Sequence, residues 1–117
     1  MESLVKEAPI FTCTYDLHCW LLDRFDGDKV ESHRNTRQTV LHHSRRLLES
    51  VTLAFENFDT ERQLVEADQS ATLLRVFLRL AAQRGLLDDR QLLFANKLLR
   101  DIGRQLGGWR KHRKSIR

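Results

Sequence analysis

The chain has 117 residues, which is enough for one hydrophobic core but not for two, so a single domain is expected. Hydrophobic residues make up 41% and charged residues 31%, a balance that excludes an intrinsically disordered chain. The net charge of +4 depends on the last eight residues, which hold five of the twenty Lys and Arg and no acid. Residues 1–109 carry 15 basic and 16 acidic side chains, so polyanion binding by this part depends on how its charges are arranged.

The sequence gives no sign of a membrane segment or a secretion signal. Residues 92–95 form one of the longest apolar runs, far below the ~20 residues that a membrane-spanning helix needs. Residues 1–7 lack the extended apolar stretch of a secretion signal. Cys13 and Cys19 are six residues apart on one predicted helix, where their side chains diverge, and unpaired thiols fit a reducing cytoplasm. A cytoplasmic protein without a membrane partner is expected.

The first half of the chain predicts two helices. A short N-terminal arm, residues 1–11, precedes a helix from about Thr12 to Phe25, and the turn signal at residues 26–28 ends it. A second helix begins near Ser32 or Asn35 and runs to about Phe55. Its core side is predicted from residues that recur at helical spacing, namely Val40, Ser44, Leu47, Leu48, Val51 and Phe55.

The second half predicts two longer helices. Thr60 and Gln63 have the spacing of a capping box, and the third helix covers about Thr60 to Arg84 before Gly85, a residue suited to a left-handed cap. Negative charge at residues 88–89 favours the start of a fourth helix, which runs through Trp109. Short loops make successive helices antiparallel, so the predicted fold is all-α: an antiparallel up-down four-helix bundle of residues 1–109 with a basic C-terminal tail, residues 110–117.

Arginine stripes are the main functional signal. On the fourth predicted helix the cations lie opposite the apolar side, and on the second they do so too, except that Arg37 turns toward the apolar side. A guanidinium binds phosphate through two donors at once, which suits a nucleic-acid backbone. The alternative is a solvated surface with intrahelical pairs such as Lys97 with Asp101. The predicted nucleic-acid contacts are Arg34, Arg37, Arg45, Arg46, Arg90, Lys97, Arg100 and Arg104 in the helices, and Arg110, Lys111, Arg113 and Lys114 in the tail. Because few aromatic residues interleave these charges, recognition of the backbone is expected more than recognition of bases.

The third predicted helix is apolar on two sides. One stripe suits the bundle core, and a second, formed by Leu73, Val76 and Leu80, lies nearly opposite. One four-helix core cannot bury both stripes, so the second predicts self-association. The alternative is that a loop or the N-terminal arm, with Ile10 and Phe11, covers it.

No catalytic site, metal site, cofactor or small-molecule substrate is predicted. Arg37 and His42 match the loose Arg-x4–6-His pattern of the HEPN ribonucleases, but any helix rich in Arg and His produces that pattern by chance, so catalysis is the lesser alternative. The histidines and cysteines show no pair of metal-ligand spacings, and the sequence holds neither a Gly-rich phosphate loop nor a nucleophile elbow.

Glycines inside the fourth predicted helix need an explanation, since each costs about 1 kcal/mol relative to alanine. Gly103 and Gly107 are four residues apart, which suits a small-residue side where another backbone approaches. Trp109 is expected to close one end of the core rather than to stack on a base.

Residues 98–109, Leu-Leu-Arg-Asp-Ile-Gly-Arg-Gln-Leu-Gly-Gly-Trp, resemble the closing motif of the accessory variability determinant proteins of diversity-generating retroelements. Residues 14–17 with 20–22, residues 32–34, and residues 78–81 with 85–87 agree with that family in order and spacing. The resemblance covers about residues 9–111. Residues 35–38 depart from it, because the family often has an aromatic, a Thr, a Leu and a Gly where this chain has Asn-Thr-Arg-Gln.

The resemblance implies a four-helix bundle related to the proteins encoded in 23S ribosomal RNA intervening sequences. Such proteins form a homopentameric ring with a basic surface, associate with the retroelement's reverse transcriptase, and bind template RNA and DNA during mutagenic retrohoming, with no catalytic activity of their own. The expected function is therefore that of a non-enzymatic nucleic-acid-binding accessory protein. A protein-protein adaptor that does not bind nucleic acid is the alternative, with a ribonuclease using Arg37 and His42 behind it.

Overall fold

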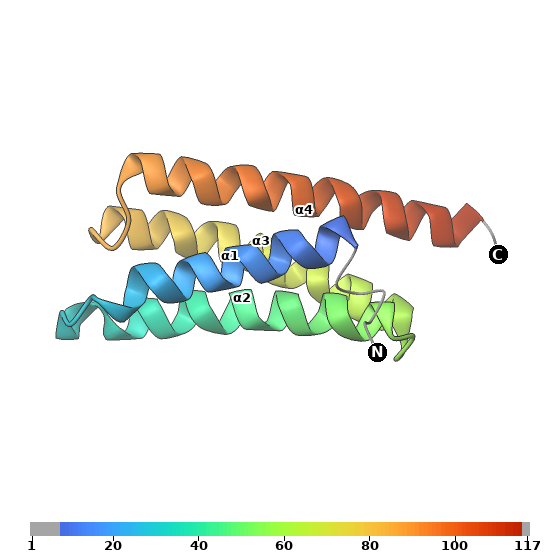
Figure 1. Ribbon diagram of the computed structural model, residues 1–117, viewed down its shortest axis with the longest axis horizontal. Coiled ribbons are helices and arrows are strands. Elements are labelled where there is room, and N and C mark those ends of the chain that lie inside the picture. Colours follow the sequence, from blue (N-terminus) through green and yellow to red (C-terminus); the bar gives the residue numbers. More distant parts are fainter. Residues whose placement is uncertain (1–7, 116–117) are drawn as a thin grey trace.

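The computed structural model describes residues 8–115, which form four antiparallel helices joined by short connections (Figure 1). The helices are α1 (Pro9–Asp26), α2 (Arg34–Phe55), α3 (Thr60–Gln83) and α4 (Asp89–Ser115), and a 3-10 turn, η2 (Glu31–His33), leads into α2. Each helix packs on two neighbours, α1 on α2, α2 on α3, α3 on α4 and α4 on α1. This confirms the predicted all-α, antiparallel up-down four-helix bundle.

One apolar stripe from each helix forms the core. The side chains of Leu17 and Leu21 from α1 are fully buried. The rings of Phe55 and Trp109 meet at 4.8 Å and close one end of the core, as predicted for Trp109. The buried residues at the centre of the other three helices are Val40, Leu47, Val51, Leu64, Leu74, Leu78, Leu99, Ile102 and Leu106.

Two helices are longer than predicted. α1 begins at Pro9 rather than near Thr12, because a proline in the first turn needs no hydrogen-bond donor and already has a helical φ. Ile10 is buried in the core, so the predicted arm of residues 1–11 is too long. α4 continues past Trp109 to Ser115 and extends beyond the other helices at its C-terminal end (Figure 1). The described part of the basic tail is therefore helical.

The end of α3 is the predicted left-handed cap. Gly85 has φ +87°, a conformation that costs other residues about 1–2 kcal/mol. Its N–H donates to the carbonyl of Ala82 (3.1 Å), and the N–H of Leu86 donates to the carbonyl of Ala81 (2.9 Å). These two bonds form a Schellman motif, which satisfies the last carbonyls of the helix.

The predicted capping box at the start of α3 is wrong. Thr60 is already the first helical residue, and its hydroxyl donates to the carbonyl of Ala54 (3.2 Å). A capping box occurs instead before α4, where the N–H of Gln91 donates to Asp88 Oδ1 (2.8 Å) and the N–H of Asp88 donates to Gln91 Oε1 (3.0 Å).

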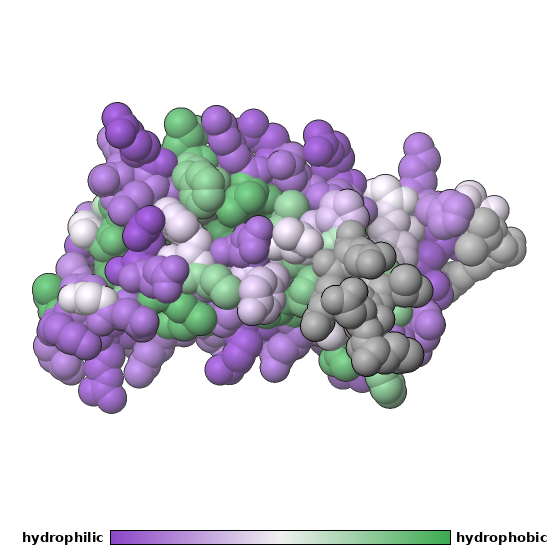
Figure 2. Space-filling view, viewed as in Figure 1, coloured by the Kyte–Doolittle hydropathy of each residue, from purple (hydrophilic) through white to green (hydrophobic). Residues whose placement is uncertain are grey.

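Hydrophilic residues cover most of the face shown in Figure 2, with apolar residues gathered where α4 lies beside α1. Trp20 of α1 and Phe94 of α4 meet there with ring centroids 5.1 Å apart, and Phe94 remains 45% exposed. Among the described helices, none combines the length and the hydropathy that a membrane span requires.

Candidate nucleic-acid interface

A groove between α3 and α4 gathers three arginines. Arg75 and Arg79 are one turn apart on α3, and Leu92, Asn96 and Arg100 follow one side of α4 at intervals of four residues. The groove has a volume of about 480 Å³, and none of the residues that line it is acidic. Three guanidinium groups and one amide therefore converge on a surface where no carboxylate competes for them, which is an arrangement suited to phosphate. We call this set of five residues the arginine groove.

Arg75 is fixed in the arginine groove by a hydrogen bond across the two helices. Its Nη2 donates to the carbonyl of Leu99 (3.3 Å), the carbonyl to which the N–H of Gly103 is directed in the helix. A Cβ on residue 103 would stand 3.0 Å from that Nη2. Gly103 therefore leaves room for a guanidinium, not for a neighbouring backbone as predicted, and nothing lies within 4 Å of a Cβ on Gly107.

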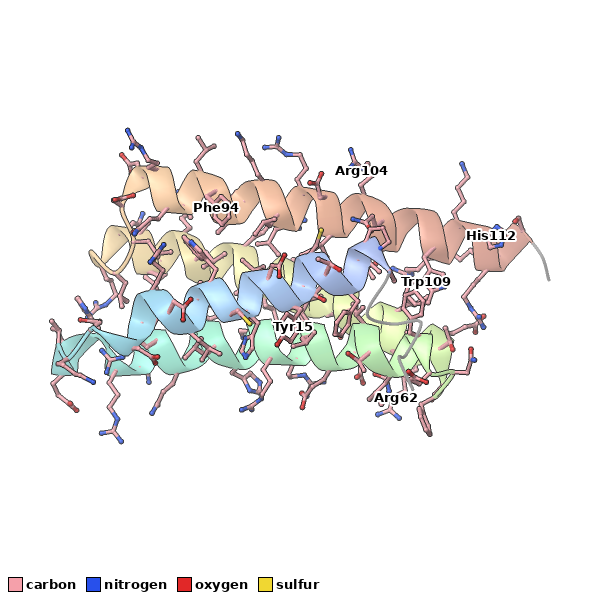
Figure 3. All side chains as sticks on the ribbon, in the orientation of Figure 1. Tyr15, Arg62, Phe94, Arg104, Trp109 and His112 are labelled. Carbon is pink, nitrogen blue, oxygen red and sulfur yellow. The ribbon has the colours of Figure 1, made fainter. Side chains whose placement is uncertain are left out.

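The arginine groove continues into the cation stripe on the outward side of α4. Side chains tipped with nitrogen point away from the bundle along this helix, Arg104 among them (Figure 3). Arg104 pairs with Asp101 (Nη2–Oδ1 3.0 Å), so the predicted pair between Lys97 and Asp101 does not form. Within the described chain, Arg90, Lys97 and Arg100 make no ion pair. An exposed pair such as Arg104–Asp101 contributes at most about 1 kcal/mol, so Arg104 can exchange its carboxylate for a phosphate.

Arg37 is occupied inside the fold. Its Nη1 donates to Asp28 Oδ2 (3.0 Å) and to the carbonyl of Val30 (2.9 Å), and its side chain is only 18% exposed. His33 Nδ1 also lies 2.9 Å from Asp28 Oδ2. Burial acts to raise the pKa of the Asp28 carboxyl, but the hydrogen bonds from His33, from the N–H of Val30 and from Arg37 outweigh it and lower that pKa. Arg37 thus holds the connection between α1 and α2 and is not part of the interface.

The other cations of α2 do not form one stripe. Arg34 pairs with Glu31 (3.4 Å) at the exposed start of the helix. Arg45 and Arg46 are adjacent in sequence, so they point about 100° apart on the helix. Arg46 turns toward α3 and pairs with Glu66 (3.4 Å), whereas Arg45 turns toward α1. The second helix therefore contributes isolated cations, a looser arrangement than the continuous stripe of the fourth helix.

Three of the four C-terminal cations that the structure describes turn back onto α3. Arg110 forms a close ion pair with Asp68. Arg110, Arg113 and Lys114 line a small cavity of about 180 Å³ with Glu61 at the start of α3. Lys111 is exposed, with no ion pair to any described residue. Residues 110–115 of the tail are therefore helical, and the bundle partly neutralises their charge.

The predicted interface of α3 is exposed. Leu73, Val76 and Leu80 are 44%, 59% and 37% exposed on the side of α3 opposite the core. The alternative prediction is that Ile10 and Phe11 of the N-terminal arm cover these side chains. In the structure, Ile10 is buried in the core and Phe11 stacks on Tyr15 of its own helix (5.7 Å). We call Leu73, Val76 and Leu80 the α3 stripe.

The pKa values of two histidines are lowered, which reduces their positive charge. Burial, followed by the charge of Arg45, lowers the pKa of His18, although Glu49 acts in the opposite direction. Burial, followed by the charges of His42 and Arg46, lowers the pKa of His43. Arg37 is held by Asp28 and the carbonyl of Val30, so its Nη1 is already occupied, whereas His42 lines the groove beside α1. No group of three or more His, Cys, Asp or Glu in the described chain is placed to hold a metal ion.

Arg75 and Arg79 are absent from the predicted contacts. On α3 they lie between two apolar stripes, and the apolar pattern of this helix is stronger than the cationic one. A signal was nevertheless present, since residues 69–87 contain three arginines and no acid. What the sequence alone does not give is the packing of α3 on α4 that brings Arg100 to the same groove.

The fold and the groove together define a small helical bundle with an arginine-lined surface. Comparison with protein-family models, with curated proteins and with solved structures finds no match to this chain.

We expect Gly103→Ala and Gly107→Ala to affect stability alike but RNA binding differently. Both replace a glycine inside a helix, so each is expected to raise the free energy of unfolding by up to about 1 kcal/mol. Only Gly103→Ala places a Cβ 3.0 Å from Arg75 Nη2, and if the shift it requires breaks the bond to the Leu99 carbonyl, RNA binding is expected to weaken up to about fivefold. Urea unfolding and fluorescence anisotropy measure the two effects. Equal RNA affinities of the two variants would contradict the role given to Arg75.

Proposed function

We propose that this chain is a non-enzymatic nucleic-acid-binding accessory protein of a diversity-generating retroelement. It holds template RNA, and the DNA copied from it, against the reverse transcriptase during mutagenic retrohoming. The observation that carries nucleic-acid binding is the arginine groove, in which Arg75, Arg79 and Arg100 converge without an acid among the lining residues. The reverse transcriptase partner and the cellular setting, the cytoplasm, are supported by the resemblance of residues 98–109.

Binding in the arginine groove is directed at the phosphate backbone. Guanidinium groups supply paired donors for phosphate oxygens, whereas the groove offers one amide, Asn96, for a base edge. Lys97 and Arg104 extend the positive surface along α4, so a strand can follow the helix over several phosphates. Such contacts fix the position of a strand without selecting its sequence, which suits a protein that accompanies a template of variable sequence.

The α3 stripe supports a homo-oligomer as part of the same proposal. Three apolar side chains on one exposed side of a helix favour burial against a second copy. The family that the chain resembles forms homopentamers, which makes a ring of five the proposed assembly. Arg75 and Arg79 are on the same helix as the stripe, so a ring would place successive arginine grooves beside its interfaces.

Salt dependence of RNA binding tests the proposed function. Three to five phosphate contacts to a single strand predict that the logarithm of the association constant falls with the logarithm of salt concentration at a slope of about −2 to −3.5. The measurement is fluorescence anisotropy of a labelled 12-nucleotide RNA between about 50 and 400 mM salt. A flat response, or no binding at low salt, would favour the protein-protein adaptor instead.

A further inference from the structure

A second groove, between α1 and α2, differs in chemistry from the arginine groove. His18 and Leu22 line it from α1, one turn apart, and Gln38, Leu41, His42 and Arg45 line it from one side of α2. Its volume of about 510 Å³ lies within the ~300–1,000 Å³ of typical small-ligand pockets. Because α1/α2 and α3/α4 are opposite pairs of the bundle, the two grooves lie on opposite sides of the molecule.

The groove combines apolar, polar and cationic surface. Leu22 is 37% exposed and Leu41 is half-buried, so together they present an apolar wall. Gln38 is exposed and carries both a donor and an acceptor, and Arg45 supplies a guanidinium that makes no ion pair with any described residue. None of the residues that line the groove is acidic. These groups match, respectively, the flat side of a base, its polar edge and a phosphate.

His18 is held in place at the bottom of this groove. Its Nδ1 lies 2.8 Å from the hydroxyl of the buried residue Ser44, which fixes the orientation of the ring. The Nε2 of the same ring is left without a partner in the described chain, so it can bond to a ligand. A polar group whose geometry is set in advance costs less to use in binding than a free surface side chain.

His42 is supported by a chain of ring contacts that begins on α3. The half-buried ring of Phe77 stacks on His43 (centroids 5.4 Å apart, planes at 20°), and His43 meets the exposed ring of His42 edge to face at 5.1 Å. These contacts restrict the exposed imidazole, which is one of the rings on which unpaired bases stack. A bare phosphate would not require such a platform, and neither would a carboxylate of a partner protein.

We propose that the α1/α2 groove holds one unpaired nucleotide of a single-stranded nucleic acid, with its base between His42 and the leucines, its polar edge at Gln38 and its phosphate at Arg45. This inference rests on the proposed nucleic-acid-binding function, but it adds a preference for unpaired bases that the arginine groove does not provide. Single-stranded regions of a template would then be favoured over duplex of the same charge.

The experiment compares binding of three probes to the full chain at pH 8, which is above the ordinary pKa of about 6.5 of a free imidazole. The probes are a 12-nucleotide oligouridylate, an RNA duplex of the same length and inorganic polyphosphate, which has no bases. His42→Ala is compared with His112→Ala, since both histidines are exposed on helices and only His42 lines the groove. A second comparison uses two double variants. Leu22→Ala with Gln38→Ala changes the groove, and Leu93→Ala with Gln69→Ala makes the same changes outside it. His42→Phe restores a ring without the imidazole nitrogens.

We expect His42→Ala to weaken oligouridylate binding about tenfold and to leave polyphosphate binding unchanged, as the loss of one stacked base predicts. His42→Phe should bind oligouridylate as the original chain does, and the Leu22/Gln38 variant should lose affinity while its matched control does not. The inference is overturned if the groove variants bind like their controls, or if polyphosphate binding falls in parallel. If the unchanged chain binds none of the three probes, the proposed function fails as well, so the two failures can be told apart.

Discussion

Replacing Arg79 and Arg100 together by alanine is expected to weaken binding of single-stranded RNA about 25-fold at 0.1 M salt, because two phosphate contacts are lost and each contributes about 0.7 to the salt slope. The slope itself should become shallower by about 1.4. Both side chains are exposed and make no ion pair with a described residue, so the fold should be unaffected. Glutamate at the same two positions should weaken binding further, since it adds repulsion to the loss of attraction.

The matched control removes two cations elsewhere. Arg24→Ala with Arg62→Ala makes the same change in net charge, but Arg24 lies over Trp20 and Arg62 pairs with Asp59 and Glu66, outside the arginine groove. If binding responds only to the total charge, the two double variants will lose affinity equally. Such a result would contradict the groove as the site. Circular dichroism and a melting curve for each variant would show that the bundle is intact.

Much of the fold follows from local signals in the sequence. Four helices with short connections are predicted from the apolar stripe of each helix, the turn at residues 26–28 and Gly85. Short connections make successive helices antiparallel. The errors lie at helix ends, where local bonds compete. Pro9 extends α1, and the hydroxyl of Thr60 turns to the preceding helix instead of capping its own. Ends depend on contacts made by the folded chain, which a helical period does not contain.

The candidate site was less accessible to sequence reasoning. The helical wheel places Arg90, Lys97, Arg100 and Arg104 on the outward side of a helix, and all four are exposed on α4 in the structure. The wheel does not show which helix packs next to that side, so it misses Arg75 and Arg79. The wheel also cannot show whether a cation forms an ion pair inside the fold. Arg37, for example, pairs with Asp28, which is nine residues away in sequence. Contacts between helices, not propensities, decide which cations face solvent.

Replacing Val76 by glutamate is expected to dissociate the proposed homo-oligomer into 13.8 kDa chains. Burying a fully exposed Val or Leu side chain contributes about 1.5–3 kcal/mol, so the partly exposed α3 stripe would supply part of the interface energy, and a buried unpaired carboxylate would oppose association strongly. Val76 is 59% exposed in the single chain, so the substitution should leave the helices intact. Native mass spectrometry and light scattering measure the assembly directly.

Comparing a long RNA with a short one separates the effect of assembly from the effect of binding at a single arginine groove. In a ring, a long RNA contacts several arginine grooves at once, and linked sites can raise the apparent affinity by about 10²–10⁴ over that of one site. Val76→Glu should therefore reduce binding of a long RNA much more than binding of a 12-nucleotide RNA, which one groove can hold. Leu53→Glu is the matched control, because Leu53 is 39% exposed on α2 and belongs neither to the α3 stripe nor to the arginine groove. A single-chain mass for the unchanged protein at tens of micromolar, or equal effects of the two substitutions, would show that the α3 stripe does not drive assembly and that each chain holds its RNA alone.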